Sequence, residues 1–394
     1  MTEKRTCPYA KACGACAFTG QPYEETLKEK ERTVAKLLAP YVRLEGITGM
    51  EHPYGYRNKV HRVYGLCDSG RTRKRVSGIY AAGSHQVVPV RGCLIEDERA
   101  QEILRTVTEL MDDFRIRYYD EDSGQGLLRH VLIRTAHATG QIMVTLVLAS
   151  PVLPGKKHFL EKLLKRHPEI TTVVININDR PTNAVLGARE QTAYGRGYIE
   201  DVLCGKTFRI SSRSFYQVNP VQTEKLYLKA MEMAQLNGHG RVIDAYCGIG
   251  TIGLIAADRA KEVIGVESNR EAVRDAAANA KLNGARNIRF TAADAGEFLT
   301  MLSAEEKADV VFLDPPRAGA SEAFLRAAAA SSPGRIVYIS CNPETLARDL
   351  GILKKLGYRA KEAAAFDMFP WTETQHVETV VGLVRTGGRN KGGT

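Results

Sequence analysis

The chain has 394 residues and a formal net charge of +10. At about 100–200 residues per domain, this length predicts two or three domains. A composition that is 44% hydrophobic and 25% charged argues against a disordered or fibrous chain. The longest apolar run, Ile142–Ala149, is far shorter than the ~20 residues that cross a bilayer, and residues 1–7 lack the apolar core of a secretion signal. We therefore expect a cytoplasmic protein without a membrane span, whose positive charge is compatible with a polyanionic partner.

The first half of the chain predicts an α+β region. Residues 23–38 are expected to form an amphipathic helix, because their apolar residues recur at helical spacing. From about residue 54 to 215, short β-rich runs are separated by turn signals, and helices are expected over residues 95–114 and 157–166. The β-rich runs are 78–80, 86–90, 131–133, 142–148 and 172–177.

From about residue 216 the pattern changes to a strict alternation of strands and helices. Asn219-Pro220 suits a helix start, and this helix is expected to run to Leu236. Further helices are expected over residues 270–282 and 322–330. The expected strands are 241–244, 262–267, 288–291, 309–313, 335–340, 358–367 and 377–384. Such alternation predicts an α/β domain with a doubly wound, Rossmann-like parallel sheet.

This change of pattern divides the chain into two regions. The α+β region covers residues 1–215 and the α/β domain residues 216–394, with the boundary placed within residues 211–219. The helix over residues 23–38 is a candidate to pack back on the second domain, so the boundary in sequence need not be a boundary in space.

A glycine-rich loop follows the first strand of the predicted α/β sheet. Gly248, Gly250 and Gly253 spell GxGxxG, and glycine lets the backbone turn tightly and approach a ligand where a strand gives way to a helix. Glu267 ends the next strand, where a carboxylate can accept hydrogen bonds from ribose hydroxyls. The motif alone fits a nicotinamide dinucleotide site, an S-adenosylmethionine site or a purely structural turn.

Two features favour S-adenosylmethionine. Asp244 stands at the strand end four residues before the first glycine, as in the loop of methyltransferases, and the motifs further along the chain do not suit hydride transfer. Asp294, after the third strand, suits the adenine edge. Tyr246, within the loop, is a further candidate contact of the cofactor.

A cysteine and two carboxylates follow later strands of the same sheet. Asp314 opens Asp-Pro-Pro-Arg after the fourth strand, Cys341 stands in Ser-Cys-Asn-Pro after the fifth, and Glu378 lies just beyond the Phe-Pro-Trp turn at residues 369–371. Because open α/β sheets bind ligands at their carboxyl edge, we expect these side chains to meet beside the cofactor. Each has a plainer interpretation, as a buried strand-end cysteine, a helix cap (Asp314) and a surface glutamate.

This set suits methylation of carbon 5 of a pyrimidine. That carbon is a poor nucleophile until a thiolate adds to carbon 6, after which carbon 5 can attack a sulfonium methyl group. A base must then remove the carbon-5 proton before the thiol is eliminated. We assign Cys341 as the nucleophile, Glu378 as the base and Asp314 as the residue that holds the uracil N3–H edge.

Four motifs together resemble the RNA uracil-5 methyltransferase family, which includes RumA-, RumB-, RlmCD- and TrmA-type enzymes. These motifs are residues 244–253, 314–319, 340–350 and 376–379. The resemblance implies an S-adenosylmethionine-dependent RNA methyltransferase with the same roles for Cys341, Glu378 and Asp314. It also places Gln217 at the cofactor and Phe215 near the target base. From the residues alone, Phe215 could equally be a core aromatic.

Three rival functions are weighed against this resemblance. A cytosine-5 RNA methyltransferase carries a Pro-Cys motif where this chain has Asp314-Pro-Pro-Arg317. An amino methyltransferase carries an aromatic residue where Arg317 stands, so we take Arg317 as a substrate contact instead. A non-catalytic RNA-binding or assembly protein is disfavoured by the intact set of Cys341, Glu378 and Asp314.

Three of the eight cysteines lie within the first sixteen residues. Cys7, Cys13 and Cys16 are a compact ligand set without a fourth member, for which Cys93 is the best candidate and Cys67 and Cys204 are the spares. Four thiolates can hold zinc or a [4Fe–4S] cluster, and spacing alone does not separate them. The resemblance implies a [4Fe–4S] cluster on Cys7, Cys13, Cys16 and Cys93, with a structural or RNA-positioning role.

A basic segment between residues 54 and 91 is the candidate phosphate-binding surface. It contains Arg57, Lys59, Arg62, the run 71–75 and Arg91 against a single acid, Asp68. The target base must be unstacked, so we expect a single-stranded or foldable RNA as the partner of a monomeric enzyme. Some relatives carry a β-barrel TRAM domain before the cysteines, which we do not expect here because only six residues precede Cys7. We predict a uridine of 23S rRNA as the target, with a tRNA uridine as the alternative.

Overall fold

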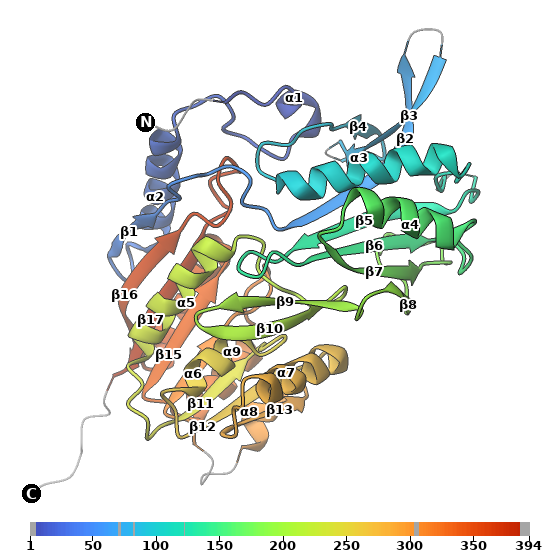
Figure 1. Cartoon of the computed structure of the whole chain (residues 1–394). Coiled ribbons are helices and arrows are strands. Elements are labelled where there is room, and N and C mark those ends of the chain that lie inside the picture. The colour runs from blue at the N-terminus through green and yellow to red at the C-terminus, as the bar shows by residue number, and fades with distance from the viewer. Residues whose placement is uncertain (1–4, 70–71, 82, 122, 303–306, 387–394) are drawn as a thin grey trace, which may run out of the picture.

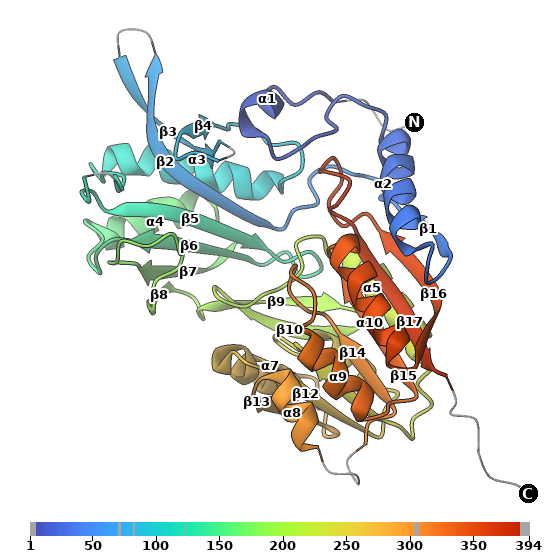
Figure 2. The same cartoon turned by 180° about the vertical axis from the view of Figure 1, so that it is seen from behind.

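The structure, a computed structural model, describes residues 5–69, 72–81, 83–121, 123–302 and 307–386, and of residues 66–75 within these ranges it describes the backbone alone. Within these residues, a seven-stranded sheet in the N-terminal half stands beside an eight-stranded sheet in the C-terminal half (Figure 1). A hairpin of β9 (Tyr198–Leu203) and β10 (Lys206–Ser211) lies between the two sheets in both views (Figures 1 and 2).

The N-terminal sheet has the strand order β4-β3-β2-β5-β6-β7-β8. Its strands are β2 (Lys59–Ser69), β3 (Thr72–Tyr80), β4 (Val87–Pro89), β5 (Leu128–Thr135), β6 (Ile142–Leu148), β7 (Ile170–Ile177) and β8 (Arg189–Tyr194). Neighbours are antiparallel except β6 and β7, which α4 (Lys156–Arg166) joins by a crossover. Helix α3 (Glu98–Asp113) and α4 pack on one face of this sheet around a shared core. A short helix, α1 (Ala10–Cys13), lies above it (Figure 1).

The C-terminal sheet has the strand order β1-β16-β17-β15-β14-β11-β12-β13. Its strands are β1 (Leu44–Thr48), β11 (Arg241–Ala245), β12 (Glu262–Glu267), β13 (Ile288–Ala292), β14 (Val310–Leu313), β15 (Arg335–Ser340), β16 (Tyr358–Phe366) and β17 (Glu378–Arg385). One face packs on α5 (Pro220–Ala234), α6 (Thr251–Ala257) and α7 (Arg270–Leu282). The other packs on α2 (Tyr23–Leu38), α8 (Ala295–Met301), α9 (Glu322–Ala330) and α10 (Pro343–Lys355). The predicted α/β fold with helices on both faces is confirmed.

The expectation of a wholly parallel sheet is wrong at one strand. β17 runs antiparallel to both of its neighbours, β15 and β16. The physical reason is the connection, because residues 367–377 join β16 to β17 without a helix, and a parallel pair needs a long crossover. The sheet is therefore mixed.

Residues from the N-terminal half complete the C-terminal sheet. β1 pairs in parallel with β16, and α2 packs beside it with Val34 and Leu38 fully buried (Figures 1 and 2). The segment 23–48 thus belongs in space to the sheet that carries the predicted catalytic residues. The domain boundary near residue 215 stays a prediction for the rest of the chain.

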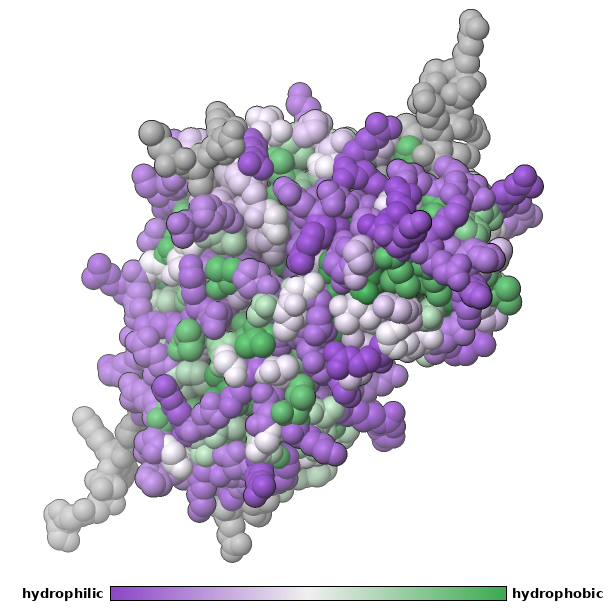
Figure 3. Space-filling model, in the orientation of Figure 1, coloured by the Kyte–Doolittle hydropathy of each residue, from purple (hydrophilic) through white to green (hydrophobic). Residues whose placement is uncertain are grey.

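The protein surface in view is mostly hydrophilic, and its hydrophobic residues form small separate patches (Figure 3). Across the part of the chain that the structure describes, no helix combines the length and apolar character needed to cross a bilayer.

Candidate active site

Cys341, Glu378 and Asp314 come together at the ends of three neighbouring strands. Asp314 directly follows β14, Cys341 directly follows β15, and Glu378 begins β17 on the other side of β15. The carboxylates of Glu378 and Asp314 both act electrostatically on the Cys341 thiol, which places the three groups in one site. The antiparallel direction of β17 is what brings its first residue to the carboxyl edge of the parallel strands.

Burial sets the protonation of these three groups. Burial and then the charge of Asp314 raise the pKa of Glu378 to about 8, and burial raises the pKa of Asp314 to about 7. Burial and both carboxylates raise the pKa of Cys341 to about 11, against the opposite effect of Arg317. Glu378 is 3% exposed, and its Oε2 has no hydrogen-bond partner among the described residues. A buried oxygen without a partner is costly, which marks it as a group with a ligand or a proton to receive.

The loops that carry Asp314 and Cys341 are tied together. Asn342 caps α10, and its Nδ2 donates a hydrogen bond to the Arg317 carbonyl at 3.4 Å. The Thr345 hydroxyl donates to the same carbonyl at 3.3 Å. The Ser-Cys-Asn-Pro and Asp-Pro-Pro-Arg motifs therefore form one bonded unit, which fixes the cysteine relative to the carboxylate.

All three glycines of the motif that follows β11 have structural reasons. Gly250 has φ 83°, in the left-handed region that favours glycine, and caps α6. The Gly253 amide donates to Asp244 Oδ2 at 2.7 Å, and a Cβ at Gly253 would lie 2.9 Å from that oxygen. Gly248 also has a positive φ, 54°, but a Cβ at this position would meet nothing within 4 Å. The backbone is therefore open to a ligand at Gly248.

Asp244 and Glu267 keep hydrogen-bonding capacity beside this open position. Asp244 is fully buried, its Oδ1 has no partner among the described residues, and burial raises its pKa to about 8. Glu267 accepts hydrogen bonds from the amides of Gly248, at 3.2 Å, and Asn269, at 2.8 Å, which orient its carboxylate at the end of β12. Each carboxylate oxygen has two lone pairs, so acceptor capacity remains. These residues fit an adenosyl ligand.

The other predicted cofactor residues lie in three different settings. Asp294 caps α8 by accepting two amide N–H groups through Oδ1, and is exposed. Tyr246 packs against Phe324, with ring centroids 5.2 Å apart. Gln217 is buried, and its backbone carbonyl accepts a hydrogen bond from Asn58 Nδ2 at 3.2 Å. Asp294 therefore has a structural role as the cap of α8, and its contact with a cofactor stays a prediction.

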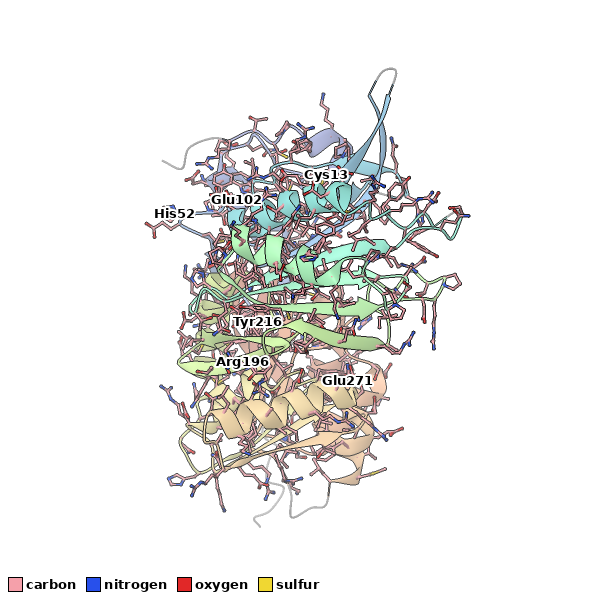
Figure 4. The ribbon with its side chains drawn as sticks, turned by 45° about the vertical axis from the view of Figure 1, so that its right-hand side comes forward. Cys13, His52, Glu102, Arg196, Tyr216 and Glu271 are labelled. Carbon is pink, nitrogen blue, oxygen red and sulfur yellow. The ribbon has the colours of Figure 1, made fainter. Side chains whose placement is uncertain are left out.

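Phe215 stands between two cavities. A cavity of about 160 Å³ lies against Gly248 and Glu267, and one of about 600 Å³ lies in front of the N-terminal cysteines; Phe215 lines both. Its side chain is 68% exposed, so its interpretation as a core aromatic is wrong. The neighbouring Tyr216 is the buried one, and Figure 4 shows it between Cys13 and Glu271, a residue of the smaller cavity. An exposed aromatic in this position can stack on a base.

Cys7, Cys13, Cys16 and Cys93 all line the larger cavity. The charges of the other three act on Cys16, and its pKa is raised to about 12, mainly by burial. Burial raises the pKa of Cys93 to about 11. Among the described residues, however, no three or more His, Cys, Asp or Glu side chains are arranged to hold a metal ion. The structure thus gathers the four predicted ligands on one cavity without forming a coordination site.

The two spare cysteines are placed apart from these four. Cys204 lies in the turn between β9 and β10, and its thiol contacts the Glu224 carbonyl at 3.9 Å. The side chain of Cys67 lies outside the described side chains. Of the candidates for a fourth ligand that the structure describes, Cys93 is therefore the one beside the other three.

The basic segment is only partly available to a phosphate. Arg62 is buried and paired through its two terminal guanidinium nitrogens with Glu96, so its inclusion in a phosphate-binding surface is wrong. Arg57 and Lys59 line the larger cavity, and burial with neighbouring Arg134 lowers the pKa of Lys59 to about 8. The side chains of the predicted run 71–75 lie outside those described.

Sequence reasoning missed a buried tyrosine under the site. Tyr227 of α5 is 2% exposed and hydrogen-bonds to Thr251 at the start of α6. Burial raises the pKa of Tyr227, and the charges of Asp314, Glu378 and Asp244 add to the effect. In the sequence, Tyr227 has the pattern of an ordinary core residue of a helix, and it belongs to none of the motifs that mark the site.

The chain matches known RNA methyltransferases over nearly all its length. Residues 105–386 match the sequence profile described as tRNA (Uracil-5-)-methyltransferase. An uncharacterized RNA methyltransferase of Halalkalibacterium halodurans is 41% identical over 383 residues, which cover 96% of this chain and 82% of the relative. One of Caldanaerobacter subterraneus subsp. tengcongensis is 42% identical over 379 residues, covering 95% and 82%.

A solved structure shares the whole architecture. The tRNA (uracil-54, C5)-methyltransferase of Pyrococcus abyssi, in complex with S-adenosyl-L-homocysteine, superposes with a TM-score of 0.78 at 26% identity. The match covers 96% of this chain and 87% of the other. The similarity therefore extends across both sheets.

Proposed function

Because the chain belongs to the tRNA (uracil-5-)-methyltransferase family and is an S-adenosylmethionine-dependent RNA methyltransferase, we propose that it methylates carbon 5 of a uridine through a covalent adduct with Cys341. The observation that carries this proposal is the meeting of one thiol and two buried carboxyls at the ends of β14, β15 and β17. A methyltransferase that acts on an already nucleophilic atom has no need of the thiol.

The residues of the chain divide the reaction between them. The Cys341 thiol gives its proton to solvent, and the thiolate adds to carbon 6 of the uracil. The electron pair displaced towards carbon 5 makes that carbon nucleophilic. S-adenosylmethionine supplies the electrophilic methyl group. Glu378 as carboxylate then accepts the carbon-5 proton, and the returning electron pair breaks the sulfur–carbon bond and frees the thiolate. Asp314 and Arg317 hold the uracil, with Asp314 accepting from N3–H.

The donor site is proposed at the glycine-rich loop. The unpartnered Oδ1 of Asp244, the oriented carboxylate of Glu267 and the open face of Gly248 support it. Tyr246, Gln217 and Asp294 are proposed as further contacts. The exposed Phe215 stands at the rim and is proposed to stack on the target base.

We propose 23S rRNA as the first target class, from the resemblance to relatives with the same cysteine pattern. tRNA is the second candidate, and the name of the Pyrococcus abyssi neighbour supports it. The test uses purified protein, labelled S-adenosylmethionine, and separate pools of unmodified rRNA and tRNA. We expect 5-methyluridine in the rRNA pool, mapped to one or two sites. Label in tRNA alone would replace the first target by the second. Binding of both substrates without transfer to either would leave only a non-catalytic RNA-binding protein.

We propose a [4Fe–4S] cluster on Cys7, Cys13, Cys16 and Cys93. The shared cavity and the soft thiol donors support the proposal, since thiolates are the usual ligands of such clusters. Bound there, a cluster would cross-link α1, its following loop and the segment before α3, which is a structural contribution.

Metal analysis checks the cluster. We expect anaerobically purified protein to be brown and to contain about four iron atoms per chain. The Cys93→Ser variant should lose most of this iron, whereas the matched Cys204→Ser variant should keep it. Stoichiometric zinc, or iron that does not depend on Cys93, would contradict the assignment.

A further inference from the structure

The loop from residue 367 to 377 leads directly to the proposed base. Phe366, the last residue of β16, is paired in register with Glu378, the first residue of β17. The loop enters and leaves the sheet at this pair, so a shift of the loop is transmitted to Glu378. What holds the loop therefore bears on the catalytic step that Glu378 performs.

A buried ion pair from α2 holds the start of this loop. Lys30 Nζ lies 2.7 Å from Asp367 Oδ1, and both side chains are completely buried. The Tyr23 hydroxyl donates to Asp367 Oδ2 at 2.8 Å and accepts the Met50 amide at 3.0 Å. The Asp367 amide donates to the Thr48 carbonyl at 3.0 Å. A charged pair is costly to bury, and here the two partners of the Asp367 carboxylate, Tyr23 and Lys30, lie more than 300 positions away in the sequence.

The next residues of the loop are held by the same N-terminal segment. Lys30 Nζ also donates to the Phe369 carbonyl at 2.8 Å. Trp371 donates through Nε1 to the Pro53 carbonyl at 2.8 Å and stacks on Tyr54, with ring centroids 5.3 Å apart. Trp371 has φ 72°, a strained conformation for a bulky side chain that persists only where its surroundings impose it. In both views this loop lies beside α2 (Figures 1 and 2).

Two further contacts connect the loop 367–377 with the region around Glu378 and with the N-terminal cysteines. The ring of Phe369 packs edge-on against His376, two residues before Glu378, at 6.2 Å. On the other side, Cys16 and Cys93 pack against the buried cluster that contains Trp371. A chain of contacts therefore connects the cysteine cavity, through the loop 367–377, with the proposed base Glu378.

We propose that Lys30 and Asp367 are positioning residues for Glu378, acting through the loop 367–377. The inference rests on the proposed function and adds to it that α2 controls proton removal from carbon 5. Loss of the ion pair lets the loop move, so Glu378 no longer meets the carbon-5 proton at hydrogen-bonding distance. The addition of Cys341 to carbon 6 precedes this step and does not need the base.

The test separates these two steps in the full-length protein with ordinary uridine RNA and labelled S-adenosylmethionine. For Lys30→Met we expect kcat to fall about 100-fold, because a misplacement of about 1 Å at a catalytic group costs that much. Because the slowed step follows methyl transfer, kcat/KM for RNA should stay near its wild-type value and KM should fall with kcat. A methyl-labelled covalent protein–RNA adduct should accumulate on a denaturing gel. Lys28→Met, an exposed lysine of the same helix, should behave as wild type and form no lasting adduct.

Tyr23→Phe provides the second variant, because removal of one partner of a buried ion pair can prevent folding. It removes the hydroxyl that donates to Asp367 and accepts the Met50 amide, and it keeps the ring and the ion pair. We expect a smaller loss of kcat with the same adduct. A folded variant with wild-type turnover, or one that loses turnover without adduct, overturns the inference. If wild-type protein forms no adduct with 5-fluorouridine RNA, the proposed function fails instead.

Discussion

The Cys341→Ala variant is expected to lose methyl transfer to RNA by at least about 10⁴-fold, the scale seen when an enzyme loses its nucleophile. In the proposed scheme, only the thiolate can add to carbon 6 and activate carbon 5. The substitution removes a single sulfur atom from a half-buried position, so the fold should be retained. The thermal melting temperature should therefore stay close to that of wild type.

RNA containing 5-fluorouridine at the target position gives the direct measurement. Because the fluorine cannot leave as a proton does, wild-type protein should become covalently attached to the RNA in the presence of S-adenosylmethionine. Cys341→Ala should give no such adduct, whereas Cys204→Ala, in the β9–β10 turn, should give the full amount. An adduct that survives the loss of Cys341 would exclude this residue as the nucleophile.

The alternating strands and helices of the C-terminal sheet, together with α2, could be predicted from the sequence. Strands β11 to β17 and helices α2, α7 and α9 lie where the periodicity placed them, because each buries an apolar stripe that is visible in the sequence. The α/β motifs then follow, since Asp314 and Cys341 stand directly after strands. Neither observation depends on contacts between distant parts of the chain.

The β9–β10 hairpin shows a local signal that was missed. Cys204 and Gly205 form its two-residue turn with φ values of 49° and 73°, a turn in which both central residues are left-handed. Asn-Gly or Asp-Gly is the usual sequence for such a turn, and cysteine in the first position hides it. The alternation of buried and exposed residues along β9 and β10 was then the only remaining sign of a hairpin in the sequence.

The sequence predicts that the helix over residues 23–38 can pack on the second domain, and the structure confirms this packing. The addition of β1 to the sheet and the contacts of Tyr23 and Lys30 with Asp367 could not be predicted, because these contacts join residues 344 and 337 positions apart. In the sequence of an amphipathic helix, a lysine is ordinarily expected to be exposed to solvent, even next to the apolar stripe. Only the tertiary contacts show that Lys30 is completely buried.

The Glu378→Gln variant is expected to stop the reaction after methyl transfer, at the covalent stage. Glutamine keeps the shape of the side chain but cannot accept the carbon-5 proton, and loss of a general base costs about 10²–10⁴-fold in turnover. Labelled methyl should therefore co-migrate with a protein–RNA adduct on ordinary uridine RNA, in an amount equal to the enzyme present. Released 5-methyluridine at wild-type rate would show that another group removes the proton.

The raised pKa of Glu378, about 8, predicts a pH dependence for the wild-type enzyme that the Glu378→Gln variant lacks. Below that value the carboxyl holds its proton and cannot act as a base, so the rate of proton removal from the methylated adduct should rise about tenfold per pH unit up to pH 8. Asp314 lies close enough to raise the pKa of Glu378, so the profile belongs to the coupled pair. Asp314→Asn removes that neighbouring charge and should move the midpoint for turnover to lower pH, while Glu378→Gln should abolish turnover at every pH. A wild-type profile that falls between pH 6 and pH 8 would mean that a protonated Glu378 is the active form, and the base would have to be sought elsewhere in the site.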